Sequence, residues 1–147
     1  MDNIMYKRNM SGFTLIEIMV VVVILGILAA MVVPKLLSRP DQAKVTVAKA
    51  DIEAISQALE LYRLDNGMYP TTDQGLEALV KQPTTSPEPR NWNPEGYLKR
   101  VPVDPWNRPY LYMQPGVHGK YDLYSLGANG EDGGEGINAN ITNWDEE

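Results

Sequence analysis

The sequence is poor in the side chains that most enzymes and metal sites use. It contains no cysteine and a single histidine, His118, among 147 residues. The absence of cysteine excludes disulfides, thiolate nucleophiles and cysteine-based zinc sites. One histidine leaves no partner for a histidine metal cluster or a proton relay, and Ser125 lacks the sequence context of a nucleophile elbow. We therefore expect a protein that is not an enzyme.

Positive charge is also scarce. The chain has 13 Lys and Arg against 19 Asp and Glu, a formal net charge of -6. An acidic protein repels the phosphate backbone, so we expect no nucleic acid among its partners. The length suits one domain with an appendage.

Charge is missing altogether from one stretch of the chain. Residues 18–33 carry no charged or strongly polar side chain. At about 1.5 Å per residue, a helix over residues 13–33 is roughly 30 Å long, the thickness of a bilayer's hydrocarbon core. The pattern predicts a transmembrane helix over residues 13–33, followed by a water-soluble domain over residues 34–147. A buried core helix and a cleaved signal peptide are the alternatives, and the body is too small to enclose such a helix.

Glu17 is the exception inside this predicted span. An acidic side chain costs about 2.5–3.5 kcal/mol at the centre of a membrane helix and less near its end, so it is usually paired. Residues 13–33 contain no Lys, Arg or His. The cation must come from lipid headgroups, from another chain or from a new amino terminus. A cut between Gly12 and Phe13 would create an ammonium group one helical turn from Glu17.

Residues 12–17, Gly-Phe-Thr-Leu-Ile-Glu, resemble the processing junction of type IV pilins and pseudopilins. The resemblance implies that residues 1–12 are a leader, which a prepilin peptidase removes between Gly12 and Phe13 before N-methylation of Phe13. It also implies a single-pass protein of the bacterial inner membrane, with a cytoplasmic N-terminus and a periplasmic domain over residues 34–147. The basic residues on both sides of the span do not set this orientation by themselves.

A second helical pattern follows Pro34. Apolar residues recur at spacings of three and four, which predicts that the helix continues to about Asp65. Asn66-Gly67 supplies the stop signal. The apolar seam consists of Val45, Ala48, Ile52, Ile55, Leu59 and Tyr62.

Gly26, Pro34 and Pro40 are the weak points of this long helix. All three are plain kinks, or, as the resemblance to pilin-like filaments implies, Gly26 and Pro34 bound a segment that is extended in the assembled state.

The remaining chain predicts short elements. A second helix is expected over residues 71–80 with Thr72 as its N-cap, and residues 84–94 read as a surface loop. Short aromatic-rich runs between turn residues predict a small antiparallel sheet, with a turn over residues 115–119. The three predicted strands are residues 97–101, 109–113 and 120–125. Together these elements give an α+β fold.

Four segments extend the resemblance to the whole chain. They are residues 62–66, 69–76, 104–107 and 124–130. They resemble the major pseudopilins of type II secretion, the general secretion pathway protein G family. The resemblance implies a type IV pilin-like fold, in which a long N-terminal helix, half membrane-spanning and half amphipathic, packs on a small antiparallel sheet. Asn107 stands where the family usually has glycine, and asparagine tolerates a positive φ.

The loop over residues 126–140 contains three carboxylates and five glycines. Oxygen-rich loops suit Ca²⁺, although the spacing alone reads more simply as a solvated loop. The resemblance implies one structural calcium ion here, and the expected ligands are the Leu126 carbonyl, Asn129 and Asn140, with Glu131, Asp132 or Glu135 as substitutes. Both asparagines stand where the family generally has aspartate, so we expect a weakened site.

The resemblance implies a function as the major structural subunit of a helical filament, the pseudopilus, which drives folded proteins across the outer membrane. Phe13, Glu17, Gly26 and Pro34 are the expected assembly residues. The expected partners are other copies of the chain, the prepilin peptidase, minor pseudopilins, the inner-membrane platform and its ATPase, the outer-membrane secretin and the lipid bilayer.

Two other functions fit the sequence less well. A type IV pilus subunit for adhesion or motility commonly carries a C-terminal disulfide, which this chain cannot form. A membrane-anchored periplasmic enzyme or binding module lacks visible chemistry.

Overall fold

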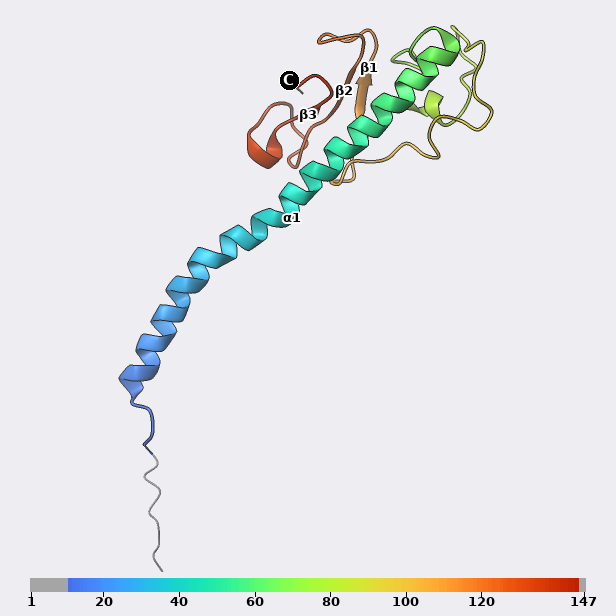
Figure 1. The fold of residues 1–147 in the computed structure, drawn as a ribbon. Coiled ribbons are helices and arrows are strands. Elements are labelled where there is room, and N and C mark those ends of the chain that lie inside the picture. Colours follow the sequence, from blue (N-terminus) through green and yellow to red (C-terminus); the bar gives the residue numbers. More distant parts are fainter. Residues whose placement is uncertain (1–10, 146–147) are drawn as a thin grey trace, which may run out of the picture. The chain divides into compact units, whose positions relative to one another are not determined.

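The computed structural model describes residues 11–145, except for the side chains of residues 32–39. The predicted leader, residues 1–12, lies almost entirely outside the described residues. The chain divides into two units, Met1–Arg39 and Pro40–Glu147 (Figure 1).

The dominant element is helix α1 (Leu15–Asn66), which confirms the predicted long helix. It ends where Asn66-Gly67 predicted. Gly67 has a φ of 78°, and its N–H donates to the Arg63 carbonyl at 2.7 Å. A left-handed residue that bonds back to the last turn is a common helix C-cap, and glycine adopts this conformation without a steric penalty.

The backbone of α1 is helical at all three predicted weak points, Gly26, Pro34 and Pro40. The expected extension of the segment Gly26–Pro34 concerns the assembled filament, so it stays a prediction.

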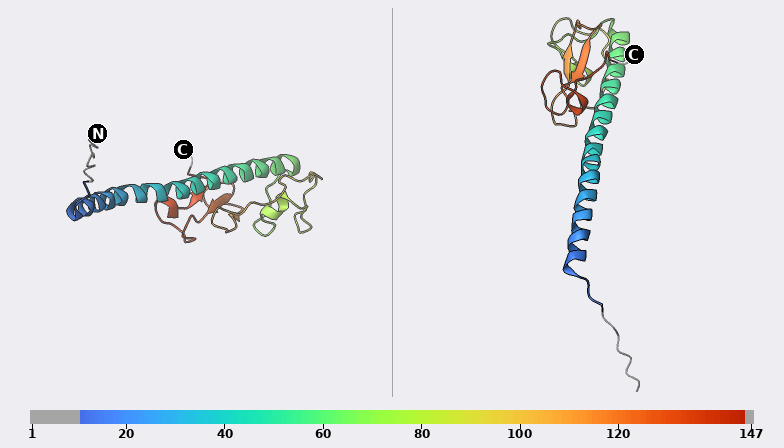
Figure 2. Two further views of the ribbon diagram at one scale, coloured as in Figure 1. Left: turned by 90° about the horizontal axis from the view of Figure 1, so that it is seen from below. Right: turned by 90° about the vertical axis from the view of Figure 1, so that its left-hand side faces the viewer.

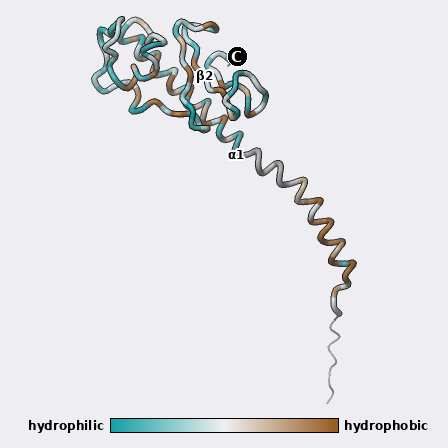
Figure 3. Tube along the Cα trace, turned by 180° about the vertical axis from the view of Figure 1, so that it is seen from behind, coloured by the Kyte–Doolittle hydropathy of each residue, from teal (hydrophilic) through white to brown (hydrophobic). Residues whose placement is uncertain are grey.

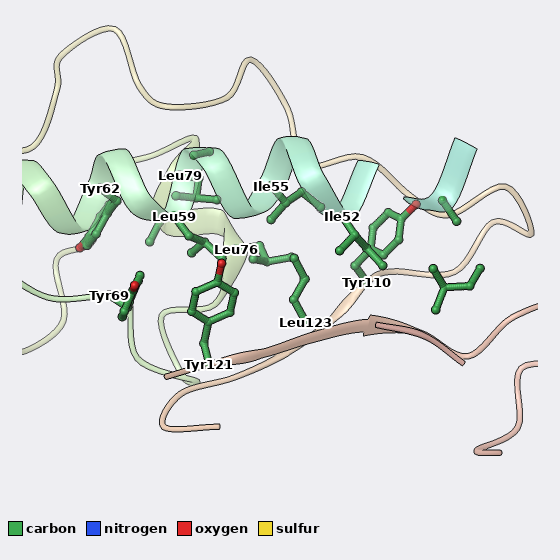
Figure 4. Close-up of a cluster of buried hydrophobic side chains, with 14 residues drawn as sticks. Ile52, Ile55, Leu59, Tyr62, Tyr69, Leu76, Leu79, Tyr110, Tyr121 and Leu123 are labelled. Atoms are coloured by element: carbon green, nitrogen blue, oxygen red, sulfur yellow. The ribbon is translucent and has the colours of Figure 1, made fainter. Parts of the chain in front are cut away.

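The second unit is built on one face of α1. The predicted seam is confirmed, with Ala48, Ile55 and Leu59 fully buried and Val45 packed at its edge. Figure 4 shows Ile55 and Leu59 facing side chains from the sheet and loops, such as Leu123 and Tyr121. In Figure 2 the sheet lies along one side of the C-terminal part of the helix. The remaining buried apolar side chains are Ile52, Ala58, Tyr62, Tyr69, Leu76, Ala78, Leu79, Tyr110, Tyr121, Leu123 and Ile141.

The described residues form one three-stranded antiparallel sheet, in the order β1-β2-β3. Its strands are β1 (Leu111–Met113), β2 (Asp122–Ser125) and β3 (Ile141–Thr142). Strands β1 and β2 confirm two predicted strands in shortened form, and the turn between them lies where it was predicted. The third strand, β3, was not predicted.

The predicted strand over residues 97–101 is wrong. The N–H groups of Tyr97 and Leu98 both donate to the carbonyl of Leu79, at 2.8 and 3.1 Å. These bonds hold the segment to Leu79, and it pairs with no strand of the sheet. The Tyr97 ring packs against the rings of Tyr62 and Trp92, with centroids 5.4 and 5.9 Å apart. The aromatic residue that suggested a strand therefore anchors a loop to the core.

The second helix is shorter than predicted, because it is the 3-10 helix η1 (Leu76–Leu79). Thr72 is not its N-cap. The Thr72 hydroxyl accepts a hydrogen bond from the Gln114 N–H at 2.9 Å and donates to the Gln114 carbonyl at 3.0 Å. The local turn is capped one residue earlier, where Thr71 and Gln74 exchange reciprocal hydrogen bonds of 3.1 and 3.2 Å.

Candidate functional site

The N-terminal junction places Glu17 against Thr14 at the start of α1. The Thr14 N–H and hydroxyl donate to the Glu17 carboxylate at 3.1 and 3.3 Å. In return, the Glu17 N–H donates to the Thr14 hydroxyl oxygen at 3.3 Å. This reciprocal arrangement is a capping box, which satisfies amide groups that the first helical turn leaves without partners.

Glu17 therefore has a partner within its own chain, which sequence reasoning missed. The signal was present, since Thr-x-x-Glu before an apolar run is the capping-box pattern. Thr14 keeps its amide after a cut between Gly12 and Phe13, so the capping box is compatible with processing. Pairing of Glu17 with a Phe13 ammonium stays a prediction.

The positions that follow, residues 18–31, are exposed and carry almost only apolar side chains. Every large hydrophobic side chain from Leu15 to Met31 is exposed within the chain, from 49% at Ile18 to 79% at Leu15. Figure 3 shows the run as a continuous apolar stretch of α1. An exposed apolar surface of this extent marks a region that contacts lipid or other proteins.

The expectation of a transmembrane span over residues 13–33 includes two positions whose side chains are not described. Across the residues that the structure describes, no helix combines the length and the apolar character needed to cross a membrane.

A tight turn after residue 103 is organised by Asp104, which is only 2% exposed. Its carboxylate accepts hydrogen bonds from the N–H groups of Trp106 and Arg108, at 3.0 and 2.8 Å. The Ser125 hydroxyl donates to the same carboxylate at 2.8 Å. Asn107 has a φ of 63°, which confirms the predicted positive φ. The turn thereby connects to the end of β2.

The glycine-rich loop, residues 126–140, begins beside this turn. The Arg108 guanidinium donates to the carbonyls of Gly127, at 2.9 Å, and Ala128, at 3.3 and 3.4 Å. Further along, the Asn140 side-chain N–H donates to the Asp132 carboxylate at 2.5 Å.

A second carboxylate, Asp122, holds the connection between β1 and β2. It accepts hydrogen bonds from the N–H groups of Val117 and His118, and its Oδ2 lies 3.0 Å from the His118 ring. The His118 ring stacks on Trp144, with centroids 4.0 Å apart. Burial raises the pKa of Asp122, but these hydrogen bonds from His118 and Val117 together outweigh burial and hold the pKa below its ordinary value.

Comparison with known proteins identifies the family. Residues 35–144 match the family described as type II secretion system protein G, and residues 7–33 match the prokaryotic N-terminal methylation motif. The chain belongs to the type II secretion system protein G family.

Individual relatives cover nearly the full chain. The type II secretion system core protein G of Pseudomonas aeruginosa is 67% identical, over 96% of this chain and 99% of the relative. That of Vibrio cholerae is 57% identical, over 93% of each. The crystal structure of the major pseudopilin from the type 2 secretion system of enterohaemorrhagic Escherichia coli is similar with a TM-score of 0.66 and 43% identity, over 77% of this chain and 96% of that one.

Protein G family membership confirms the α+β pilin-like fold and the expectation of a structural subunit in place of an enzyme. Together with the methylation motif, it implies a membrane-anchored, pilus-like periplasmic subunit.

The hydrogen bonds of the loop bear on the calcium site that the resemblance implies. The side-chain oxygens of Asn129 and Asn140 already accept backbone N–H groups, from Glu131 at 3.2 Å and Gly133 at 3.3 Å. No cluster of three carboxylate or imidazole groups suited to a metal occurs among the described residues. The donor set does not fit a carboxylate-rich calcium site.

The side chains of Glu131 and Glu135 are exposed, and Leu126 is half-buried. Calcium binding itself stays an expectation of the resemblance, which the contacts of the loop do not support.

Sequence reasoning missed Arg108 and Asp104 as the residues that organise this region. Asp104 was recognised only as part of a family motif. No sequence signal linked Arg108 to the loop, because the two lie 19 residues apart where the guanidinium meets Gly127.

Proposed function

We propose that this chain is the major subunit of the pseudopilus of a type II secretion system, a helical filament that drives folded proteins across the outer membrane. The match of residues 35–144 to the protein G family carries the proposal. The exposed apolar run Leu15–Met31 supports it, because an assembly of copies can bury that surface in a common core.

Processing prepares the chain for assembly. A prepilin peptidase removes residues 1–12 by cutting between Gly12 and Phe13, and Phe13 is then N-methylated. Residues 13–33 serve as the transmembrane and filament-core helix, and residues 34–147 as the periplasmic domain. The methylation motif over residues 7–33 supports this division.

Glu17 has two roles in this proposal. Within one chain its carboxylate caps α1 through Thr14. In the filament the same carboxylate neutralises the Phe13 ammonium of a neighbouring copy and so sets the register between subunits. The capping box holds the carboxylate at the helix start, one turn or less from the amino terminus. Extension of the segment Gly26–Pro34 accompanies assembly.

The chain is anchored in the bacterial inner membrane by one span, with its N-terminus in the cytoplasm, and enters the periplasmic pseudopilus on assembly. Its partners are other copies of itself, the prepilin peptidase, minor pseudopilins, the assembly platform with its ATPase, the secretin and the lipid bilayer. Family membership and the methylation motif support these assignments.

The experiment separates the two roles of Glu17. Glu17→Gln keeps a side-chain oxygen that can accept the Thr14 N–H but removes the charge, since Gln also completes a capping box. Thr14→Ala keeps the charge and removes the hydroxyl. Both full-length variants are produced together with the secretion system. Sheared filaments, secreted protein and the intact mass of the mature chain are then measured.

We expect Glu17→Gln to be processed normally but to lose filaments and secretion, and Thr14→Ala to retain most of both. Normal assembly of Glu17→Gln would show that charge pairing is not required. Processing at another site, seen in the intact mass, would contradict the proposed junction.

A further inference from the structure

The guanidinium of Arg108 occupies the start of the loop over residues 126–140. Its donors meet the carbonyls of Gly127 and Ala128, at 2.9 Å for the shortest contact. These are backbone oxygens that converge on one cation, as they would on a metal ion in a calcium loop. The cation here belongs to the chain itself.

The loop also closes around the same group. A Cβ placed on Gly130 would lie 2.5 Å from both Cζ and Nε of Arg108, so the guanidinium packs directly on the Gly130 backbone. Gly130 has a φ of 70°, which favours glycine. The carbonyls and the glycine thus contact the arginine from the same loop.

The position of Arg108 is fixed from the opposite side. Its N–H donates to the buried Asp104 carboxylate at 2.8 Å, and its carbonyl accepts the Asp104 N–H at 2.8 Å. The Ser125 hydroxyl, bonded to Asp104 at 2.8 Å, accepts the Gly127 N–H at 3.3 Å. One hydrogen-bonded chain therefore runs from the turn through Asp104 and Ser125 into the loop.

Amide groups close the far end of the loop. The Asn140 side chain donates to Asp132 at 2.5 Å and accepts from the Gly133 N–H at 3.3 Å. The Ala128 N–H donates to the Ile137 carbonyl at 2.9 Å. The Asn140 N–H therefore bonds to the Asp132 carboxylate, which could otherwise bind a metal ion.

We propose that Arg108 is the internal cation of the loop over residues 126–140, and that the loop holds its fold without calcium. The guanidinium supplies the positive charge and five fixed donors. Asn129 and Asn140 are neutral, so they do not repel one another as two carboxylates would, and no metal ion is needed to neutralise them. A divalent ion near the same carbonyls would be repelled by the guanidinium. The inference does not depend on filament assembly.

The test uses the full-length chain in detergent, with calcium at about 1 mM, a level that saturates all but the weakest extracellular sites, or with EGTA. Hydrogen exchange of peptides from residues 126–140 reports the loop, and thermal unfolding reports the domain. The variants are Arg108→Gln, Arg108→Lys and the matched surface control Arg100→Gln. A fourth variant combines Arg108→Gln with Asn129→Asp and Asn140→Asp.

In the unmodified chain we expect loop exchange and melting temperature to be the same with calcium and with EGTA. In Arg108→Gln the loop amides should exchange roughly tenfold faster or more. Arg108→Lys should recover part of this lost protection. Arg100→Gln should not differ from the unmodified chain. The triple variant should regain slow exchange in calcium only.

A calcium-dependent rise in loop protection or melting temperature in the unmodified chain would overturn the proposal. So would loop exchange in Arg108→Gln that equals that of Arg100→Gln. Failure of the triple variant to respond to calcium would show that the arginine and the two asparagines do not substitute for a metal site.

Discussion

The two ends of helix α1 carry similar apolar side chains, which are exposed at one end and buried on one face at the other. Between Leu15 and Met31 every large hydrophobic side chain is exposed within the chain. Between Ala48 and Tyr62 one face of the same helix is buried by the sheet and loops of its own domain. Leu25 is 59% exposed, whereas Leu59 is fully buried.

This difference indicates where each part obtains its stability. The C-terminal part of α1 contributes its seam to a core formed by the chain itself. The N-terminal part has no such core among the described residues, so its apolar surface is available to a bilayer or to other copies. Stability and assembly are therefore encoded in different parts of one helix.

The largest expected effect is the difference between a Leu→Ala substitution in the C-terminal part of α1 and one in its N-terminal part. Leu59→Ala should lower the free energy of unfolding of the domain by about 2–5 kcal/mol, because it leaves a cavity in the core. Leu25→Ala should change it by less than about 0.5 kcal/mol. Urea unfolding of the full chain in detergent measures both. Equal effects of the two substitutions would remove the distinction between the parts.

A smaller loss is expected at the buried carboxylate of Asp104. Asp104→Asn should cost about 1.5–3 kcal/mol, because hydrogen bonds to a charged acceptor from Trp106, Arg108 and Ser125 are weakened or lost. The same unfolding experiment checks it, with the exposed Asp73→Asn as control. A neutral outcome for Asp104→Asn would mean that the turn does not depend on this charge.

The start of the apolar part should respond only locally. Thr14→Ala removes the capping hydroxyl and should destabilise the first turn of α1 by about 1 kcal/mol. Hydrogen exchange should rise in peptides from the first turn, while the melting temperature of the domain stays unchanged. A lowered melting temperature would show that the two parts are coupled more strongly than the comparison indicates.

The smallest expected effect is a change in pH dependence. Because the folded-state pKa of Asp122 lies below its ordinary value of 3.8, its contribution to stability is complete above that value. The contribution is lost as the pH falls from there through the lower folded pKa. Asp122→Asn should therefore be less stable near neutral pH, and its stability should fall less steeply below about pH 4.

Urea unfolding from about pH 6 to pH 2 measures this difference, with Asp73→Asn as the control for an exposed carboxylate. A slope for Asp122→Asn as steep as that of the unmodified chain would contradict the assignment.

Features with a strong local period could be predicted from the sequence. The seam from Val45 to Tyr62 and the stop at Asn66-Gly67 have the spacing and the glycine that define a helix and its end, and α1 confirms both. The positive φ of Asn107 was expected because the family usually has glycine at this position.

Features set by tertiary contacts could not be predicted in the same way. Residues 97–101 have a strand-like composition, but the Tyr97 ring packs against Tyr62 and Trp92 at the core. Strand β3 has two residues and no pattern of its own. The contact of Arg108 with the loop joins segments that only the folded chain brings together.

In the proposed filament, other copies of the chain bury the apolar part of α1. Because the chain has no cysteine, a single cysteine at Ile27 can carry a spin label, with a second preparation labelled at the exposed Val117 as the reference. Electron spin resonance distances are measured in assembled filaments, with and without dilution by unlabelled chain. Packed helices lie about 8–10 Å apart, so labels at Ile27 should give short inter-chain distances that dilution removes, and labels at Val117 should give longer ones. Distances at Ile27 no shorter than those at Val117 would contradict the claim.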